Sequence, residues 1–246
     1  MEIELEVDDG VAVITLNAPE RRNALTPAMA GEMVETLERV DADDTIGALV
    51  IRGAEGRFCA GAHTATLSGA TSDPAGEEAY SGLSVIYESF TRVGLVKAVT
   101  ISAVRGAAVG AGMNLLMATD LRVISKQARL LSGFLRIGLH PGGGHFVLLS
   151  RLVGREAAAA MALAGEEING ERAARLGLAW DAVDDAQVED RAMEMARKIA
   201  KDPALARAAV RSLRMEVGPP GVDWATAVQT ERAPQMWSMR RREGTS

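Results

Sequence analysis

Hydrophobic and polar positions follow three different periods along this chain, and each period predicts one kind of element. Residues 3–7 alternate apolar side chains with glutamates, and a second apolar run over residues 11–16 follows a short Asp-Asp-Gly segment. Alternation flanking turn residues predicts a β-hairpin with one solvated face. Uninterrupted apolar runs over residues 46–51 and 98–104 are typical of strands that are buried on both faces.

Helical spacing separates these strands. Thr26 and Pro27 provide a helix start, and apolar side chains recur at positions 29, 33, 37 and 40, which predicts a helix from about 26 to 40. A similar pattern predicts a helix over 77–93, before the second buried strand. The alternation of strand, helix and strand indicates an α/β fold with an at least partly parallel sheet. From Arg155 onward the chain is mostly helical, with one short strand near 179–183.

Composition and charge exclude several classes of partner. The 246 residues include 27 Lys and Arg against 33 Asp and Glu, a net charge of −6, which leaves no basic footprint for nucleic acid. The uncharged stretch over 106–119 is too short to span a bilayer, and the acidic N-terminus is unlike a signal peptide. The single cysteine, Cys59, excludes an intrachain disulfide, and we interpret it as a small buried side chain rather than a nucleophile. We therefore expect a cytoplasmic protein that binds neither membrane nor metal.

Glycine is enriched, and its clusters follow predicted strands. The chain has 25 glycines, and many fall in residues 58–62, 105–112 and 141–145. Neither a phosphate-binding P-loop nor a complete dinucleotide fingerprint is present. A helix expected directly after the glycines at 110 and 112 would present free backbone amides at its start. Two such loops could supply the two donors of an oxyanion site. The alternative is that these glycines only permit close packing of strand and helix.

Four segments in order, residues 17–25, 58–62, 105–112 and 138–144, resemble the motif set of the crotonase (enoyl-CoA hydratase/isomerase) superfamily. The resemblance implies a crotonase-like spiral of ββα units. It also implies an acyl-CoA-binding core over 1–190 and a helical region over 191–246 that mediates trimerisation. The expected partner is an acyl-CoA thioester, with coenzyme A entering as part of the substrate and no separate cofactor. The expected assembly is a homotrimer or a hexamer made of two trimers.

The resemblance also implies roles for particular residues. The backbone N–H groups of Ala62 and Ala111 match the pair that holds the thioester oxygen and stabilises an enolate. The positions that match the family's coenzyme A contacts are Asn23, Ala24, Leu25, Ala60, Gly61, His63 and Gly110.

Hydratases of this family use two glutamates, and the matching positions here are Asn114 and Phe134. Neither side chain can exchange a proton near neutral pH, although a positioned acid or base contributes roughly 10²–10⁴ in rate. We therefore expect relocated acid/base residues, and the candidates are His140 and His145, which flank the loop 141–144. The alternative for both histidines is a structural role. The residues expected to line the acyl pocket are Tyr87, Asn114, Phe134 and Pro141.

These observations predict an acyl-CoA thioester enzyme of the enoyl-CoA hydratase/isomerase type, a lyase or isomerase, with atypical acid/base residues. Two alternatives stay open. One is an acyl-CoA-binding protein that has lost its chemistry, and the other is a different reaction of this fold, namely double-bond isomerisation, hydrolysis or decarboxylation.

Overall fold

The computed structural model describes residues 1–69, 73–216 and 223–243. The chain starts with the predicted hairpin, in which β1 (Ile3–Asp8) pairs antiparallel with β2 (Val11–Leu16). Glu4 and Glu6 are exposed, whereas every residue of β2 is buried. The predicted hairpin with one solvated face is therefore confirmed, and β1 lies at the edge of the sheet.

A six-stranded sheet runs through the molecule in the order β1-β2-β3-β4-β6-β9. Its further strands are β3 (Ala48–Gly53), β4 (Val99–Val104), β6 (Leu121–Ser125) and β9 (Asp181–Val183). Every pairing after the hairpin is parallel. The predicted partly parallel sheet is thus confirmed, and the carboxyl ends of its central strands share one edge.

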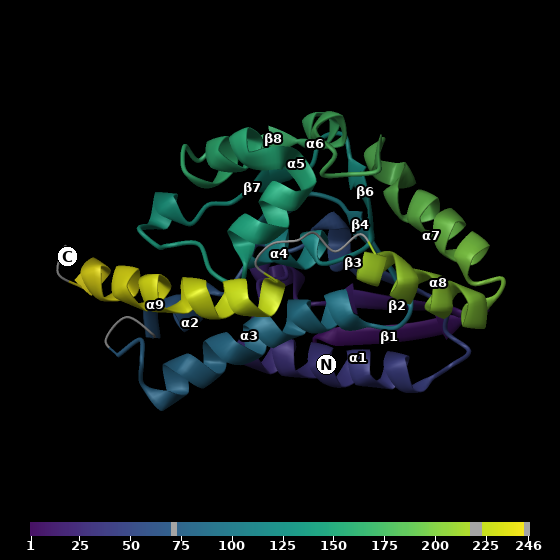
Figure 1. Cartoon of the computed structure of the whole chain (residues 1–246), viewed down its shortest axis with the longest axis horizontal. Coiled ribbons are helices and arrows are strands. Elements are labelled where there is room, and N and C mark those ends of the chain that lie inside the picture. Colours follow the sequence, from purple (N-terminus) through teal and green to yellow (C-terminus); the bar gives the residue numbers. More distant parts are fainter. Residues whose placement is uncertain (70–72, 217–222, 244–246) are drawn as a thin grey trace.

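Helices bury both faces of this sheet. On one face lie α1 (Pro27–Ala42) and α3 (Glu77–Leu95), which run side by side in Figure 1. On the other face α7 (Val188–Ile199) packs alanine and valine side chains against β3, β4 and β6. The predicted helix start is confirmed, because the Thr26 hydroxyl accepts a hydrogen bond from the Met29 amide at 3.1 Å.

A second, three-stranded sheet was not predicted. It consists of β5 (Ala107–Val109), β7 (Arg129–Leu131) and β8 (Ile168–Asn169), in that order. These strands have two or three residues each, too few to show a period. Cys59 forms a bridge with Ala108, so the loop after β3 joins this small sheet.

The remaining helices complete the α/β fold. Two are short, α2 (Thr64–Gly69) and α4 (Ala111–Met117). Then come α5 (His145–Ala162), α6 (Gly170–Leu176), α8 (Pro203–Glu216) and α9 (Trp224–Glu243), which confirm the helical character of the C-terminal third. Figure 1 shows α9 lying across the front of the molecule, near α3 and α5. In the described ranges, none of the helices combines the length and apolar character that crossing a bilayer requires.

Candidate active site

The loop after β3 and the segment from β5 to α4 are joined by backbone hydrogen bonds. The Cys59 amide donates to the Ala107 carbonyl, and the Val109 amide donates to the Cys59 carbonyl, each at 3.1 Å. A side chain at Gly112 would collide with the carbonyl oxygen of Cys59. Glycine at position 112 therefore lets the first turn of α4 sit directly against the loop 58–62.

This contact brings the two predicted oxyanion donors to one place. A Cβ atom added at Gly61 would lie 3.6 Å from the amide nitrogen of Ala111, so Ala62 and Ala111 come from adjacent stretches of backbone. Gly61 and Gly110, which precede them, have φ values of +97° and +53°, a region that glycine occupies without strain. Among the residues that the structure describes, none accepts a hydrogen bond from the amide of Ala62 or Ala111.

Both amides belong to residues that line a cavity of about 270 Å³, which we call the central cavity. This volume lies near the lower end of small-molecule pockets, roughly 300–1,000 Å³, and suits an acyl group better than a whole coenzyme A. Eight predicted site residues line it: Ala60, Gly61, Ala62, Tyr87, Gly110, Ala111, Asn114 and Phe134. Its described lining contains no carboxylate, and Arg136 is the charged side chain present.

The two candidate histidines occupy different environments. His140 is half-buried, with Nδ1 at 2.6 Å from the carbonyl oxygen of Pro141, and neither residue is part of the cavity lining. His145 is fully buried and connects to the cavity through two lining residues. Its Nδ1 lies 2.7 Å from Oδ1 of Asn114, and its Nε2 lies 2.8 Å from Oγ of Ser132. Of the two histidines, the structure links His145 to the cavity.

The hydrogen bonds of Asn114 determine which nitrogen of His145 carries the proton. Nδ2 of Asn114 donates to the Gly142 carbonyl at 2.9 Å, so its oxygen faces His145. The imidazole therefore carries its hydrogen on Nδ1, and Nε2 accepts a hydrogen bond from the Ser132 hydroxyl. Burial lowers the pKa of His145 to about 3, which keeps the ring neutral at neutral pH.

Comparisons with known proteins show which family the chain belongs to. The family model described as enoyl-CoA hydratase/isomerase matches residues 6–231. The chain belongs to the enoyl-CoA hydratase/isomerase family. A probable enoyl-CoA hydratase of Mycobacterium tuberculosis, EchA14, is 41% identical over 181 residues, covering 74% of this chain and 69% of that protein. The 1,2-epoxyphenylacetyl-CoA isomerase of Escherichia coli is 36% identical over 200 residues, covering 80% and 75%.

Solved structures of the family confirm the crotonase fold. The crystal structure of an enoyl-CoA hydratase from Bacillus halodurans superposes with a TM-score of 0.89 at 20% identity, covering 99% of this chain and 97% of that one. Together with the family match over residues 6–231, this agreement in fold confirms the superfamily that the sequence motifs indicated.

The segment predicted to contact coenzyme A braces the loop that carries Ala62. The Leu25 amide donates to the Gly61 carbonyl, and the His63 amide donates to the Leu25 carbonyl, each at 2.8 Å. The Asn23 side chain is buried, where it accepts from the Ala18 amide and donates to the Arg57 carbonyl. The cavity lining does not include Asn23, Ala24, Leu25 or His63. Their contact with coenzyme A stays a prediction.

Two aromatic residues form part of the cavity wall. Phe134 packs edge-on against the His145 ring, with 5.0 Å between centroids. The buried hydroxyl of Tyr87 donates to Gln235 of α9, and burial raises the pKa of Tyr87, which keeps the phenol protonated. Burial also raises the pKa of Cys59 to about 12, consistent with a small buried side chain rather than a nucleophile.

A carboxylate lies behind the cavity rather than in its lining. Glu231 of α9 accepts hydrogen bonds from the amides of Gly144 and His145, at 2.8 and 3.2 Å. Burial raises the pKa of Glu231, and these backbone donors oppose that shift. Glu231 therefore anchors α9 to the start of α5, beside His145. Over the described ranges, no group of three His, Cys, Asp or Glu residues is placed to hold a metal ion.

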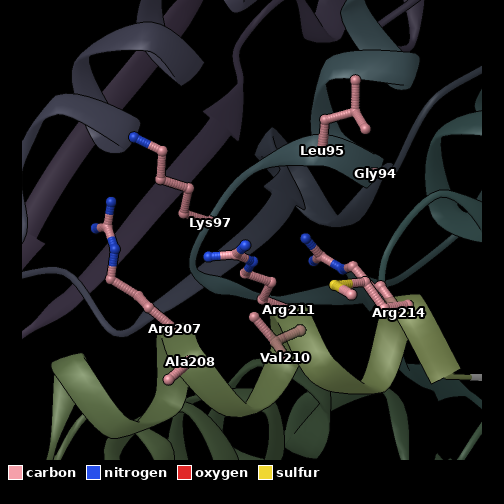
Figure 2. A pocket seen from close by; sticks show the side chains of 9 residues that line it. Gly94, Leu95, Lys97, Arg207, Ala208, Val210, Arg211 and Arg214 are labelled. Carbon is pink, nitrogen blue, oxygen red and sulfur yellow. The ribbon is translucent and has the colours of Figure 1, made fainter.

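A second hollow lies at the amino ends of the strands and has a different character. Figure 2 shows Lys97, Arg207, Arg211 and Arg214 along this hollow of about 510 Å³, which we call the basic pocket. Arg207 donates to the Asp41, Asp43 and Ile46 carbonyls, and Arg214 pairs with Asp120 at 2.6 Å. None of the predicted site residues lines this pocket, so the central cavity is the candidate active site.

Proposed function

We propose that this protein is an acyl-CoA thioester enzyme of the isomerase type, in which the amides of Ala62 and Ala111 bind the thioester oxygen and stabilise an enolate. The observation that carries the proposal is that both amides lack an acceptor within the described chain and belong to residues lining one largely apolar cavity. Preorganised amides in a dry site stabilise negative charge strongly, because no water has to reorient.

The cavity lining argues against hydration by two glutamates. The Asn114 amide is already committed to Gly142 and His145, and the ring of Phe134 packs on His145. Since no described carboxylate lines the cavity, activation of water there lacks its usual base. A reaction that moves a proton between two carbons of the acyl chain still needs an acid/base group, but it needs no activated water molecule.

His145, acting through the hydroxyl of Ser132, is the proton acceptor that this site can offer. Nε2 of His145 already accepts the Ser132 hydroxyl hydrogen, and Ser132 is part of the cavity lining. This arrangement makes His145, rather than His140, the candidate for the relocated acid/base residue.

We also propose that the chain assembles as a homotrimer, alone or paired into a hexamer. On α8 the side chains of Leu205, Leu213 and Met215 are 64%, 53% and 72% exposed, and contact with another subunit would cover such apolar surface. Light scattering coupled to size-exclusion chromatography tests this, and a monomer at micromolar concentration would contradict it.

The test of the proposed reaction uses 3-hexenoyl-CoA and 2-hexenoyl-CoA in deuterated water. We expect conversion of the 3-enoyl to the 2-enoyl thioester with deuterium incorporated at C4, the carbon that gains a proton as the double bond moves, and hydration at least ~10²-fold slower than this conversion. Mass spectrometry of the thioesters measures both. Rapid hydration without isomerisation would contradict the proposal, and tight binding without either reaction would favour a non-catalytic acyl-CoA-binding protein.

A further inference from the structure

Ser132, His145 and Asn114 form a line of three hydrogen-bonded side chains beside the candidate oxyanion hole. Oγ of Ser132 lies 2.8 Å from Nε2 of His145, and Nδ1 of His145 lies 2.7 Å from Oδ1 of Asn114. All three side chains are buried, and Ser132 and Asn114 are both part of the cavity lining. A hydroxyl, an imidazole and an oriented amide in this order are the components of a nucleophilic triad.

The third member of the line holds the imidazole in the tautomer that a triad requires. The hydrogen bond from Nδ2 of Asn114 to the Gly142 carbonyl turns the amide oxygen toward His145. Nδ1 of His145 therefore donates, and Nε2 is left as the acceptor for the Ser132 hydrogen. With its hydrogen directed to Nε2, Oγ of Ser132 retains lone pairs for attack on a carbonyl carbon.

Backbone pairing places this serine next to a predicted oxyanion donor. In the small sheet Val109 is opposite Leu131, and the Gly110 amide donates to the Leu131 carbonyl at 3.1 Å. Ser132 directly follows Leu131, and Ala111 directly follows Gly110. A thioester whose oxygen is bound by the amides of Ala62 and Ala111 would therefore have its carbonyl carbon near this serine.

We propose that the protein also hydrolyses acyl-CoA thioesters, with Ser132 as the nucleophile, His145 as the general base and Asn114 as the positioning residue. The inference rests on the oxyanion hole of the proposed function, because the same two amides would stabilise the tetrahedral intermediate.

In the first half of this reaction the Ser132 oxygen bonds to the thioester carbon, and its proton passes to Nε2 of His145. The carbon–sulfur bond then breaks, the sulfur takes the proton from His145, and free coenzyme A leaves while an ester remains on Ser132. In the second half a water molecule gives a proton to His145 and attacks the ester carbon. The carbon–oxygen bond breaks, Ser132 regains its proton, and a carboxylic acid is released.

The residues around the triad, Asn114 and Phe134, determine how fast we expect it to hydrolyse a thioester. Asn114 fixes the tautomer but has no negative charge with which to stabilise the imidazolium, and the apolar ring of Phe134 packs against the imidazole with 5.0 Å between centroids. Turnover should therefore be slower than with an aspartate in the third position, and deacylation is the step most dependent on water. An acyl-serine should consequently accumulate and be detectable.

The experiment measures coenzyme A release from butanoyl-CoA by the full chain, with a thiol reagent, and the mass of the acid-quenched protein. We expect steady release and a mass increase equal to one butanoyl group, located on Ser132 by peptide mapping. Ser132→Ala should lower release by about 10³-fold and remove the adduct. Ser102→Ala is the matched control, since it deletes another buried serine hydroxyl bonded to a side chain, Thr119, outside the cavity.

His145→Gln provides a second variant in case Ser132→Ala does not fold, and it should lower release by at least about 100-fold. Coenzyme A release that neither variant affects, or a wild-type protein that forms no Ser132 adduct and releases no coenzyme A, would overturn the inference. Calorimetric binding of butanoyl-CoA separates the two proposals. Binding and 3-hexenoyl-CoA isomerisation without hydrolysis would overturn only the triad, whereas absence of binding and of both reactions would overturn the proposed function as well.

Discussion

The central cavity and the basic pocket lie at opposite ends of the parallel strands and differ in the charge of their polar groups. Around the cavity the polar groups are mostly neutral: two backbone amides, and the side chains of Asn114, Ser132 and the adjoining His145. The basic pocket instead gathers four cations, seen together in Figure 2. Two of them, Arg207 and Arg214, are held by carbonyl oxygens and carboxylates of neighbouring elements.

The difference teaches that charge density and the candidate active site do not coincide in this molecule. In the basic pocket, Arg207 and Arg214 attach α8 to the segments before β3 and β4. In the central cavity, the unsatisfied groups are backbone amides, which a charge count does not register. Substitutions in the cavity should therefore change rates, and substitutions in the basic pocket should change stability.

The largest expected effect is the loss of one oxyanion donor in Ala111→Pro. Proline removes the amide hydrogen, and the first position of a helix tolerates its ring. We expect isomerisation to slow by roughly 10²–10³-fold, about 2.7–4 kcal/mol in the barrier. Steady-state kinetics on 3-hexenoyl-CoA measures the effect, and Ala111→Ser, which keeps the amide, is the control. An unchanged rate in a folded Ala111→Pro variant would show that this amide does not act on the thioester.

Restoring two carboxylates tests whether neutrality distinguishes this cavity from that of a hydratase. In the double variant Asn114→Glu, Phe134→Glu we expect hydration of 2-hexenoyl-CoA to rise by about 10–100-fold, part of what a positioned acid or base contributes. Absorbance of the enoyl thioester follows the reaction. No gain of hydration in a folded double variant would mean that positions 114 and 134 do not flank the double bond.

In the basic pocket the expected change is one of stability. Asp120 accepts hydrogen bonds from the Thr100 amide and from Arg214, at 2.8 and 2.6 Å, and its side chain is 12% exposed. Asp120→Ala should lower the free energy of unfolding by about 2–3 kcal/mol, because it leaves a charged partner unpaired. Urea denaturation measures this loss of stability.

Arg211→Ala is the control, since among the described residues Arg211 has no side-chain partner. Slower isomerisation by the folded Asp120→Ala protein would contradict the division between the two regions.

The last expected effect is a dependence of stability on pH through His145. Its pKa is about 3 in the folded chain against an ordinary value near 6.5, so below pH 6.5 the unfolded chain binds a proton that the folded chain does not. Stability from this group is thus present above pH 6.5 and is lost as the pH falls toward 3. The melting temperature of His145→Gln should therefore fall less than that of the wild type between pH 6.5 and 4.5. Parallel curves for the two proteins would contradict a buried neutral His145.

Much of the fold could be predicted because its signals are local. Thr26 and the apolar positions that follow it define α1, and the continuous apolar runs before residues 53 and 105 define β3 and β4. The strands of the small sheet could not be predicted, because two or three residues show no period. They form because backbone groups of β5, β7 and β8 pair with one another across long stretches of sequence.

The sequence allowed the backbone groups of the candidate site to be predicted, but not the contacts between its side chains. The glycine loops and the family motifs predicted that Ala62 and Ala111 lie together, and both residues line the central cavity. The choice between His140 and His145 depends on which ring meets Asn114, a contact across 31 positions of the chain. Ser132 belongs to no motif, and only the folded structure places it against His145.

The central claim is that the amides of Ala62 and Ala111 polarise a bound thioester. The most direct measurement is the ¹³C resonance of butanoyl-CoA labelled at its carbonyl carbon, free and bound to the wild-type protein and to Ala111→Pro. Two hydrogen bonds to the oxygen withdraw electron density from the carbon, so we predict a downfield shift on binding to the wild type and a smaller shift with Ala111→Pro. A carbonyl resonance that does not move when butanoyl-CoA binds to the wild type would contradict the account.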